Sequence, residues 1–357
     1  RAKFAAKEIN REVSALRSGL EVDGSGVLPI FEPGRAHALY SALIEPVERV
    51  LEGKCRVYVL ADGALSRIPL GTLVTSEPEQ GIDPNAPDAL RSLDWLADRY
   101  ALVQLPSVQS LWFIRRFHHD QSDSRHANFR GFGAPSLSET ARLRGVRSAS
   151  IAPQKADDFI GQIRDLGESP LMEPAALRNL SSLPGTQSEL EQVRMAMEAR
   201  QDDVFLGARM TEPAIRQTNL ADVDILHIAT HGFTSKDAKS VAEPGLIFTP
   251  PARATPADDG YLSASEVVGL DLSSAEWVIL SACNTAAPAA GSGKSGMSGL
   301  VKAFFYAGAE SLLVSHWPVF DDIAPILTVE TLKLSQTGMP RAEAFQAAMR
   351  KVRMDPD

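Results

Sequence analysis

A histidine and a cysteine each follow a short apolar run that is typical of a β-strand. His231 follows the run at residues 224–230, and Cys283 follows the run at residues 276–282. If these strands are parallel neighbours, the imidazole and the thiol leave the sheet at the same edge, where the imidazole can take the thiol proton. The sequence therefore predicts nucleophilic chemistry at a Cys283–His231 pair.

Gly232 adds a second part of that chemistry. Its backbone N–H and that of Cys283 can donate to an oxyanion on an attacked carbonyl, and a residue without Cβ lets a substrate approach closely. His231 lies 52 residues upstream of Cys283. This order and spacing match the caspases and oppose the papain-like enzymes, in which the cysteine comes first. We expect Gly232 and Cys283 to form an oxyanion hole.

Composition excludes several other classes of protein. The chain has 357 residues, of which 44% are hydrophobic and 23% are charged, and this is average for a globular protein of about two domains. A net charge of −9 offers no bulk attraction for nucleic acid, and no apolar run is long enough to span a membrane. Two cysteines, Cys55 and Cys283, cannot form a disulfide framework. We therefore expect a reducing, cytoplasmic compartment, no direct nucleic-acid contact and no membrane contact.

The second half of the chain alternates strand and helix patterns. Strands are predicted near residues 204–205, 224–230, 245–248, 276–282 and 310–316, and helices at 186–199, 211–219, 263–268 and 296–307, followed by two C-terminal helices. This alternation predicts an α/β fold with a mostly parallel sheet covered by helices on both faces, and active sites at the carboxyl ends of the strands.

The first half has a weaker pattern. Helices are predicted at 1–18, 35–51 and 108–118. Strands are predicted at 56–61 and at 128–133, and a further strand is predicted to begin directly after the turn at residues 62–63. Periodicity then weakens through a long loop at 135–184. We expect a helix and linker at 1–34, a first half at 35–180 and a second half at 181–357. Because the chain begins without Met and helix 1–18 has an apolar face, we also expect an upstream region.

Four blocks of sequence resemble the CHAT family of caspase-like peptidases. They are HIATHGF from His227, DDGYLSASEVVGLDLSSAEWVILSACNTA from Asp258, SGMSGLVKAFFYAGAESLLVSHWPV from Ser295 and RVYVLADGALSRIPLGTLV from Arg56. The blocks occur in the family's order and are spread over most of residues 35–335, so the resemblance is far more specific than a His–Gly and Cys pair alone. Two positions depart from the family's pattern: Asn284 stands where Glu is common, and His316 where Leu is common.

The resemblance implies a caspase-like fold in which residues 181–357 form the catalytic half and residues 35–180 a degenerate, non-catalytic half. The family's catalytic dyad maps onto His231 and Cys283. Members often carry upstream tetratricopeptide repeats and act as regulated, site-selective proteases in bacterial defence or death pathways. The resemblance thus implies an upstream repeat region or an activating partner.

Candidate substrate-binding residues follow the last predicted strand. Caspase-like enzymes bind peptides by adding them as a strand, and Ser315, His316 and Trp317 end the strand at 310–316. Trp317 has an alternative role in core packing. A substrate cut after Lys or Arg would need an acidic group to pair with the buried cation. The candidates for that group are Asp321, Asp322, Asp258 and Asp259.

Each acidic pair has a simpler interpretation. Asp321 can cap the helix that begins near residue 323, and residues 258–260 can form only a turn. Cys55 has no companions that would make it reactive, and His227 is expected to be a hydrogen-bonded core imidazole. The GSGKS run at 291–295 lacks the first Gly of a phosphate-binding loop.

The sequence thus predicts a cysteine endopeptidase that needs neither a metal nor an organic cofactor. The alternative is a catalytically silent caspase-like module that binds a partner through the same edge strand.

Overall fold

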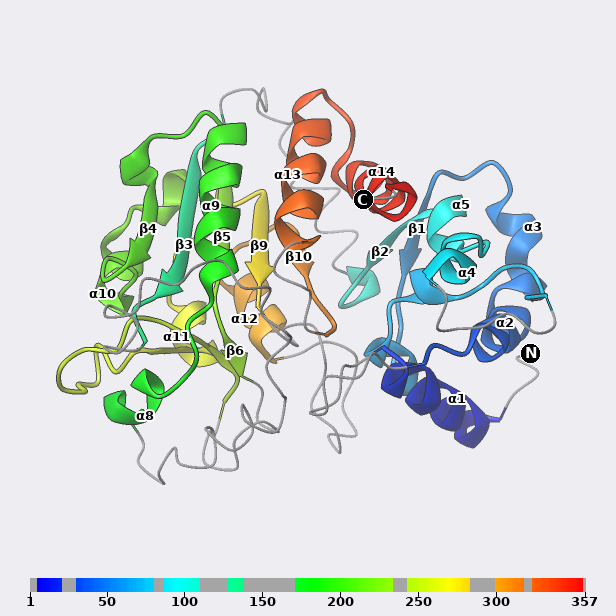
Figure 1. The fold of residues 1–357 in the computed structure, drawn as a ribbon, viewed down its shortest axis with the longest axis horizontal. Helices are drawn as coiled ribbons and strands as arrows, with labels where there is room; N and C mark the ends of the chain where they lie inside the picture. Colours follow the sequence, from blue (N-terminus) through cyan, green and yellow to red (C-terminus); the bar gives the residue numbers. More distant parts are fainter. Residues whose placement is uncertain are drawn as a thin grey trace.

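The computed structural model describes residues 5–20, 30–79, 87–109, 127–137, 171–233, 243–282, 299–317 and 323–355. Its largest element is a sheet of five parallel strands in the order β10-β9-β5-β3-β4 (Figure 1). The strands are β3 (Phe129–Pro135), β4 (Val204–Gly207), β5 (Ile225–Ala229), β9 (Trp277–Ser281) and β10 (Leu312–Val314). The predicted helix at 108–118 lies mostly outside the described residues.

Helices cover both faces of this sheet. One face packs against α9 (Pro184–Ala196) and α13 (Ile323–Gln336), and the other against α10 (Glu212–Gln217), α11 (Ala264–Val268) and α12 (Gly299–Tyr306). The side chains of β9 alternate between the two faces. Trp277 and Ile279 belong to the core beneath α9 and α13, and Val278 and Leu280 belong to the core beneath α10, α11 and α12. Burial on both faces explains why the strands read as continuous apolar runs. The predicted fold, a mostly parallel sheet covered on both faces, is confirmed.

A small antiparallel sheet follows β5. It has the order β6-β7-β8, with β6 (Gly232–Phe233), β7 (Gly245–Ile247) and β8 (Tyr261–Ser263). Helix α8 (Pro174–Arg178) packs against this small sheet, because its Leu177 shares a buried cluster with Phe233 and Tyr261. The sequence analysis missed β6 and β8 because strands this short carry no measurable period. Since β6 begins at Gly232, this sheet fixes the chain directly after His231.

The N-terminal part of the chain forms a second body with its own core. Its strands β1 (Arg56–Val59) and β2 (Ala101–Gln104) are parallel, and its helices are α1 (Ala6–Ser18), α2 (Pro33–Leu43), α3 (Glu48–Leu51), α4 (Pro87–Arg91) and α5 (Leu96–Arg99). Val13 and Leu16 of α1 are buried against α2 and the following segments. The apolar face of the predicted helix at 1–18 therefore has a partner within the chain.

Two local predictions in this body are corrected. The predicted helix at 35–51 is broken into α2, a 3₁₀ turn (Glu45–Val47) and α3, because Pro46 has no N–H to continue an α-helix. The strand expected after the 62–63 turn is instead a 3₁₀ helix (Gly63–Arg67). The Asp62 side chain accepts a hydrogen bond from the Gly63 N–H, and Gly63 has a φ of +58°. The chain therefore turns into a 3₁₀ helix instead of a returning strand, and the partner of β1 is β2.

The two bodies do not divide at residue 180. Strand β3 lies between β5 and β4 in the larger sheet, although it precedes residue 180. The C-terminal helix α14 (Arg341–Met354) packs beside β2 and α5, and Arg353 pairs with Asp98 at 2.7 and 2.8 Å. The sequence pattern identifies a strand but not its partners, so the predicted boundary differs from the observed strand pairing.

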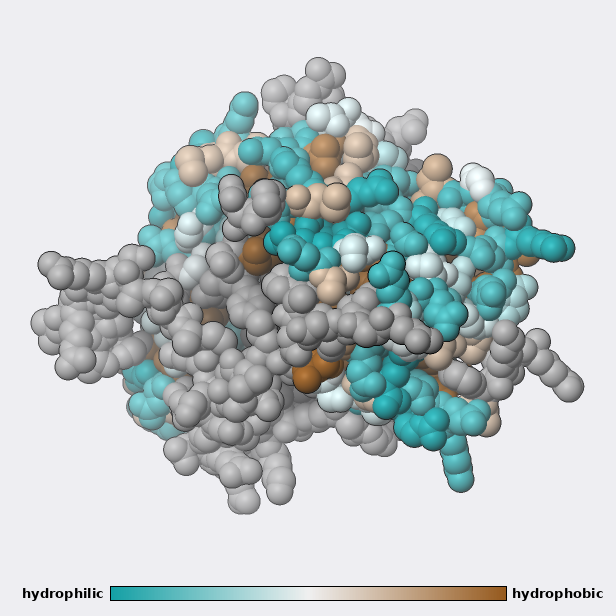
Figure 2. Space-filling view, turned by 45° about the vertical axis from the view of Figure 1, so that its right-hand side comes forward, coloured by the Kyte–Doolittle hydropathy of each residue, from teal (hydrophilic) through white to brown (hydrophobic). Residues whose placement is uncertain are grey.

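One face of the molecule is shown by hydropathy in Figure 2. In the view of Figure 2 most coloured residues are hydrophilic, and apolar residues form small patches. Among the described residues, no helix has both the length and the apolarity needed to cross a membrane.

Gly133 of β3 allows α9 to lie close to the sheet. A Cβ at this position would overlap the Leu190 side chain and come within 2.8 Å of the Ala229 carbonyl oxygen. Gly133→Ala should therefore lower the free energy of unfolding by about 1–3 kcal/mol. Gly34→Ala is the matched control, because a Cβ there meets nothing within 4 Å, and it should be neutral or slightly stabilising. Thermal unfolding of both variants measures this, and equal midpoints would contradict the close approach of α9.

Candidate active site

His231 lies at the carboxyl end of β5, between the large and the small sheet. Its side chain is buried, with 5% of the residue exposed. Thr230 before it donates its N–H to Ser281 O at 3.1 Å and its Oγ1 hydroxyl to Ile247 O at 2.6 Å. The Ile247 N–H in turn donates to the His231 carbonyl at 3.0 Å. These bonds hold the backbone of His231 between β9 and β7.

The imidazole of His231 has a defined tautomer. Nε2 lies 2.8 Å from the carbonyl oxygen of Ser181. Because a carbonyl only accepts, Nε2 carries the proton, and in the neutral ring Nδ1 carries the lone pair. Burial lowers the pKa of His231, and the Ser181 carbonyl opposes that effect. The ring is thus neutral at pH 7 and can act as a base through Nδ1.

Cys283 lies outside the described residues, but the strand that leads to it is described. In β5 and β9, Ala229 is opposite Ser281, an offset of 52 residues, and this equals the separation between His231 and Cys283 in the sequence. Ala282, the residue bonded to Cys283, is buried at the end of β9. The prediction that the two strands are parallel neighbours is confirmed.

Gly232 lies at the start of β6, an edge strand of the small sheet. It lies opposite Leu246 in the β6–β7 pair. The N–H of Ile247 donates to the carbonyl of His231, so that position is hydrogen-bonded, and in an antiparallel pair the next position is not. The N–H of Gly232 therefore points away from β7, on the edge of the small sheet.

The predicted substrate strand β10 is an edge strand of the large sheet. After it, Ser315 Oγ donates to the Ala282 carbonyl at 2.8 Å, which ties the ends of β10 and β9 together. Trp317 is half-buried, with its ring centroid 6.2 Å from that of His316. Both predicted roles of Trp317, in a pocket wall and in packing, are compatible with this placement.

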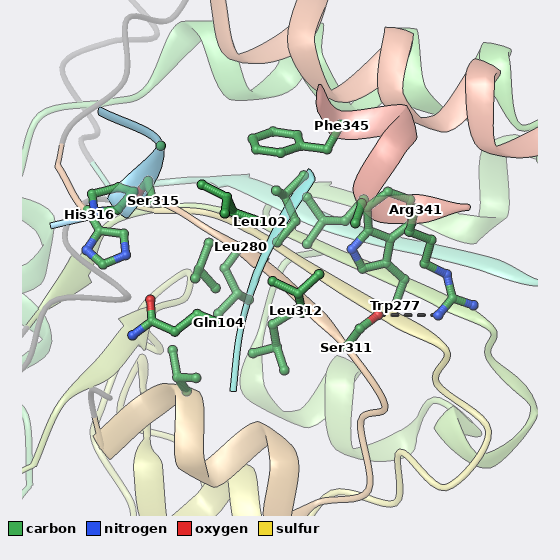
Figure 3. Close-up of a pocket in the computed structure, with 18 of the residues that line it drawn as sticks. Leu102, Gln104, Trp277, Leu280, Ser311, Leu312, Ser315, His316, Arg341 and Phe345 are labelled. Atoms are coloured by element: carbon green, nitrogen blue, oxygen red, sulfur yellow. Dashed lines mark hydrogen bonds between the residues drawn. The ribbon is translucent and has the colours of Figure 1, made fainter. Parts of the chain in front are cut away.

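A cavity of about 1640 Å³ lies along β10, between the two bodies. Leucines of β2, β9 and β10 and Phe345 of α14 project into it, with His316 and Ser315 at one end and Arg341 at the other (Figure 3). Its lining also includes Thr230, Ser281 and Ala282. The cavity therefore reaches the sheet edge that carries His231.

The acidic candidates have different placements. Asp259 Oδ1 accepts the Tyr261 N–H at 2.9 Å and Oδ2 the Met172 N–H at 2.8 Å. Asp258 adjoins it, and neither residue lines the cavity. Burial raises the pKa of Asp258 and of Asp259. This pair thus has the turn-forming role that was the alternative interpretation, while Asp321 and Asp322 lie outside the described residues.

Sequence reasoning missed a buried polar group between α9 and the strands β5 and β9. Glu189 of α9 is 2% exposed and lies 3.0 Å from His227 Nε2 through Oε1, and Ser281 Oγ donates to the same oxygen. His227 is the hydrogen-bonded core imidazole that the sequence analysis expected. No sequence signal distinguished Glu189 from the other glutamates of the predicted helix at 186–199. Among the described residues, no group of three or more His, Cys, Asp or Glu could hold a metal ion.

The fold is that of an α/β protein with a buried histidine just after β5 and with Cys283 two residues beyond the neighbouring strand β9 in the sequence. A family model described as the CHAT domain matches residues 34–357, so the chain belongs to the CHAT-domain family, as its four sequence blocks predicted. A search of curated proteins found no significant match. Among solved structures, the chain is similar to the Arg-specific cysteine proteinase gingipain R, with 9% identity, a TM-score of 0.45, and coverage of 99% of this chain and 72% of that chain.

His316 makes stability depend on pH. Burial and the nearby Arg17 lower the pKa of His316 to about 4, and its buried Nδ1 has no hydrogen-bond partner within the described part of the chain. The unfolded state, with a pKa near 6.5, binds a proton first as the pH falls, so stability is lost between about pH 6.5 and 4, by up to about 3 kcal/mol. Denaturation at several pH values should show a shallower loss for His316→Asn. The same slope in both proteins would contradict the buried neutral ring.

Proposed function

We propose that this CHAT-family protein is a cysteine endopeptidase that cleaves a specific protein substrate with Cys283 and His231. The observation that supports it best is the register of β5 and β9, whose 52-residue offset equals the separation of these residues. The buried His231, with its tautomer set by the Ser181 carbonyl, supplies the base. Membership of the CHAT family supports the same reaction class.

The proposed reaction needs only groups of the chain and water. Nδ1 of His231 takes the thiol proton while the Cys283 sulfur attacks the scissile carbonyl. The N–H groups of Gly232 and Cys283 donate to the resulting oxyanion. His231 then gives the proton to the leaving amine, and a thioester remains. Water, deprotonated by His231, hydrolyses the thioester and returns the thiol.

The dyad is tested by substitution. Cys283→Ala and His231→Ala should each reduce cleavage by about 10²-fold to 10⁴-fold or more, since a nucleophile or its base is removed. The matched control is Cys55→Ser, because Cys55 is an exposed free thiol and its replacement should leave activity unchanged. A peptidyl electrophile followed by mass spectrometry should label Cys283. Cleavage at the parental rate by Cys283→Ala would refute the mechanism, and an unlabelled Cys283 would favour the silent interaction module.

We also propose that the activity is regulated, by an upstream repeat region or an activating partner, in a bacterial defence or death pathway, as the family resemblance implies. One contact supports a route for such control. Arg17 of α1 donates to the carbonyls of Arg67, at 2.6 Å, and His316, at 3.0 Å. The N-terminal helix thus holds the residue that follows the proposed substrate strand.

Arg17→Ala should loosen that strand end. We expect KM for a peptide substrate to rise about tenfold with kcat within about twofold, because substrate binding and not the dyad is affected. Arg17→Lys should restore part of the loss, and Arg11→Ala is the control, since the Arg11 side chain is 72% exposed. Steady-state kinetics on chains with matched thermal midpoints measure this. An unchanged KM in Arg17→Ala would rule out the coupling.

A further inference from the structure

Glu189 presents one carboxylate oxygen to the cavity. Its Oε1 accepts a hydrogen bond from Ser281 Oγ and lies 3.0 Å from His227 Nε2. Within the described part of the chain, Oε2 accepts none, and Glu189 is one of the residues that line the cavity. These contacts on one oxygen orient the carboxylate and leave the other oxygen for a ligand.

The described contacts of Glu189 are all made through one oxygen. His227 is fully buried, and its Nδ1 has no hydrogen-bond partner among the described residues. Its Nε2 faces Glu189 Oε1 at 3.0 Å and is hydrogen-bonded to Ser281 Oγ at 3.3 Å. His227 and Ser281 therefore occupy the Oε1 side of the carboxylate and leave the Oε2 side to the cavity.

The other charged side chains of the cavity have partners. Arg56 pairs with Glu343, Arg341 with Glu276 and Glu310, and Arg350 and Arg353 with Asp98. These ion pairs account for all the arginines of the lining. Among the described residues, no Lys or Arg contacts Glu189. A ligand that brings a cation would therefore meet a carboxylate oxygen with which no Lys or Arg of the described residues competes.

Glu189 also lies beside the strand that leads to Cys283. Ser281, which donates to its Oε1, precedes Cys283 by two residues, and two residues of chain span at most about 7 Å. The residue before the cut bond must place its carbonyl carbon beside the thiol. A Lys or Arg side chain that runs from there toward Ser281 has the length to reach Oε2.

We propose that Glu189 determines specificity by pairing with a Lys or Arg side chain that precedes the cut bond. The inference rests on the proposed peptidase function and names the substrate class for that site. It assigns to Glu189 the role that the sequence analysis sought among Asp258, Asp259, Asp321 and Asp322.

The test uses two peptidyl acyloxymethyl ketones that differ only in the last residue, Arg or Leu. Mass spectrometry of the 357-residue chain measures the rate at which each labels Cys283. We expect the Arg probe to react at least about tenfold faster. In Glu189→Gln the Arg probe should slow by about 100-fold, because the cation loses its only charged partner, and the Leu probe should stay within about twofold.

Two further variants make the result specific to this carboxylate. Glu191→Gln is the matched control on the same helix: Glu191 pairs with Arg194 and does not line the cavity, so the preference for Arg should persist. Glu189→Asp keeps the charge and should keep the preference at a lower rate. Thermal unfolding confirms that each variant is folded.

Each outcome separates the two proposals. Equal labelling by both probes, or a Leu preference, in the unmodified chain overturns the basic specificity and leaves the peptidase function standing. A preference for Arg that survives in Glu189→Gln assigns the cation to another carboxylate and overturns the role of Glu189. Failure of both probes to label Cys283 overturns the peptidase function, and the specificity with it.

Discussion

The parallel pairing of β5 and β9 is the constraint on which the site depends. Because Ala229 is opposite Ser281, the chain leaves both strands at the same level of the sheet. His231 is the second residue after β5, and Cys283 is the second residue after β9. A slip of one residue would turn every side chain of a strand to the other face. Burial of both faces makes that slip costly, so packing of the two cores sets the register that the proposed chemistry requires.

Helix α9 turns this strand pair into a pocket. Gly133 lets the helix approach the sheet closely, and the segment before it brings the Ser181 carbonyl to His231. One turn into the helix, Glu189 reaches between β5 and β9. The helix and the segment before it thus orient the His231 ring and place a carboxylate beside β9. Backbone and buried groups do this work, which keeps the geometry rigid.

The second body completes the environment of the edge strand. Arg353 of α14 pairs with Asp98 of the N-terminal body. Arg17 of α1, also in that body, donates to the carbonyl of His316, which follows β10. These contacts span more than 250 residues of sequence. They leave an apolar cavity along β10 that opens toward the strand ends. The N-terminal body therefore shapes one wall of the proposed substrate site.

Local pattern was enough to determine the strand–helix alternation and the parallel sheet and to single out His231 and Cys283 as candidates, because apolar periodicity and residue type are properties of the sequence itself. The strand partners were decided by the tertiary structure: β3 joined the large sheet and β1 paired with β2, since pairing depends on contacts distant in the chain. Glu189 could not be recognised either. Its position beside His227 and Ser281 arises only where α9 covers β5 and β9, and burial there, not residue type, distinguishes it from other helical glutamates.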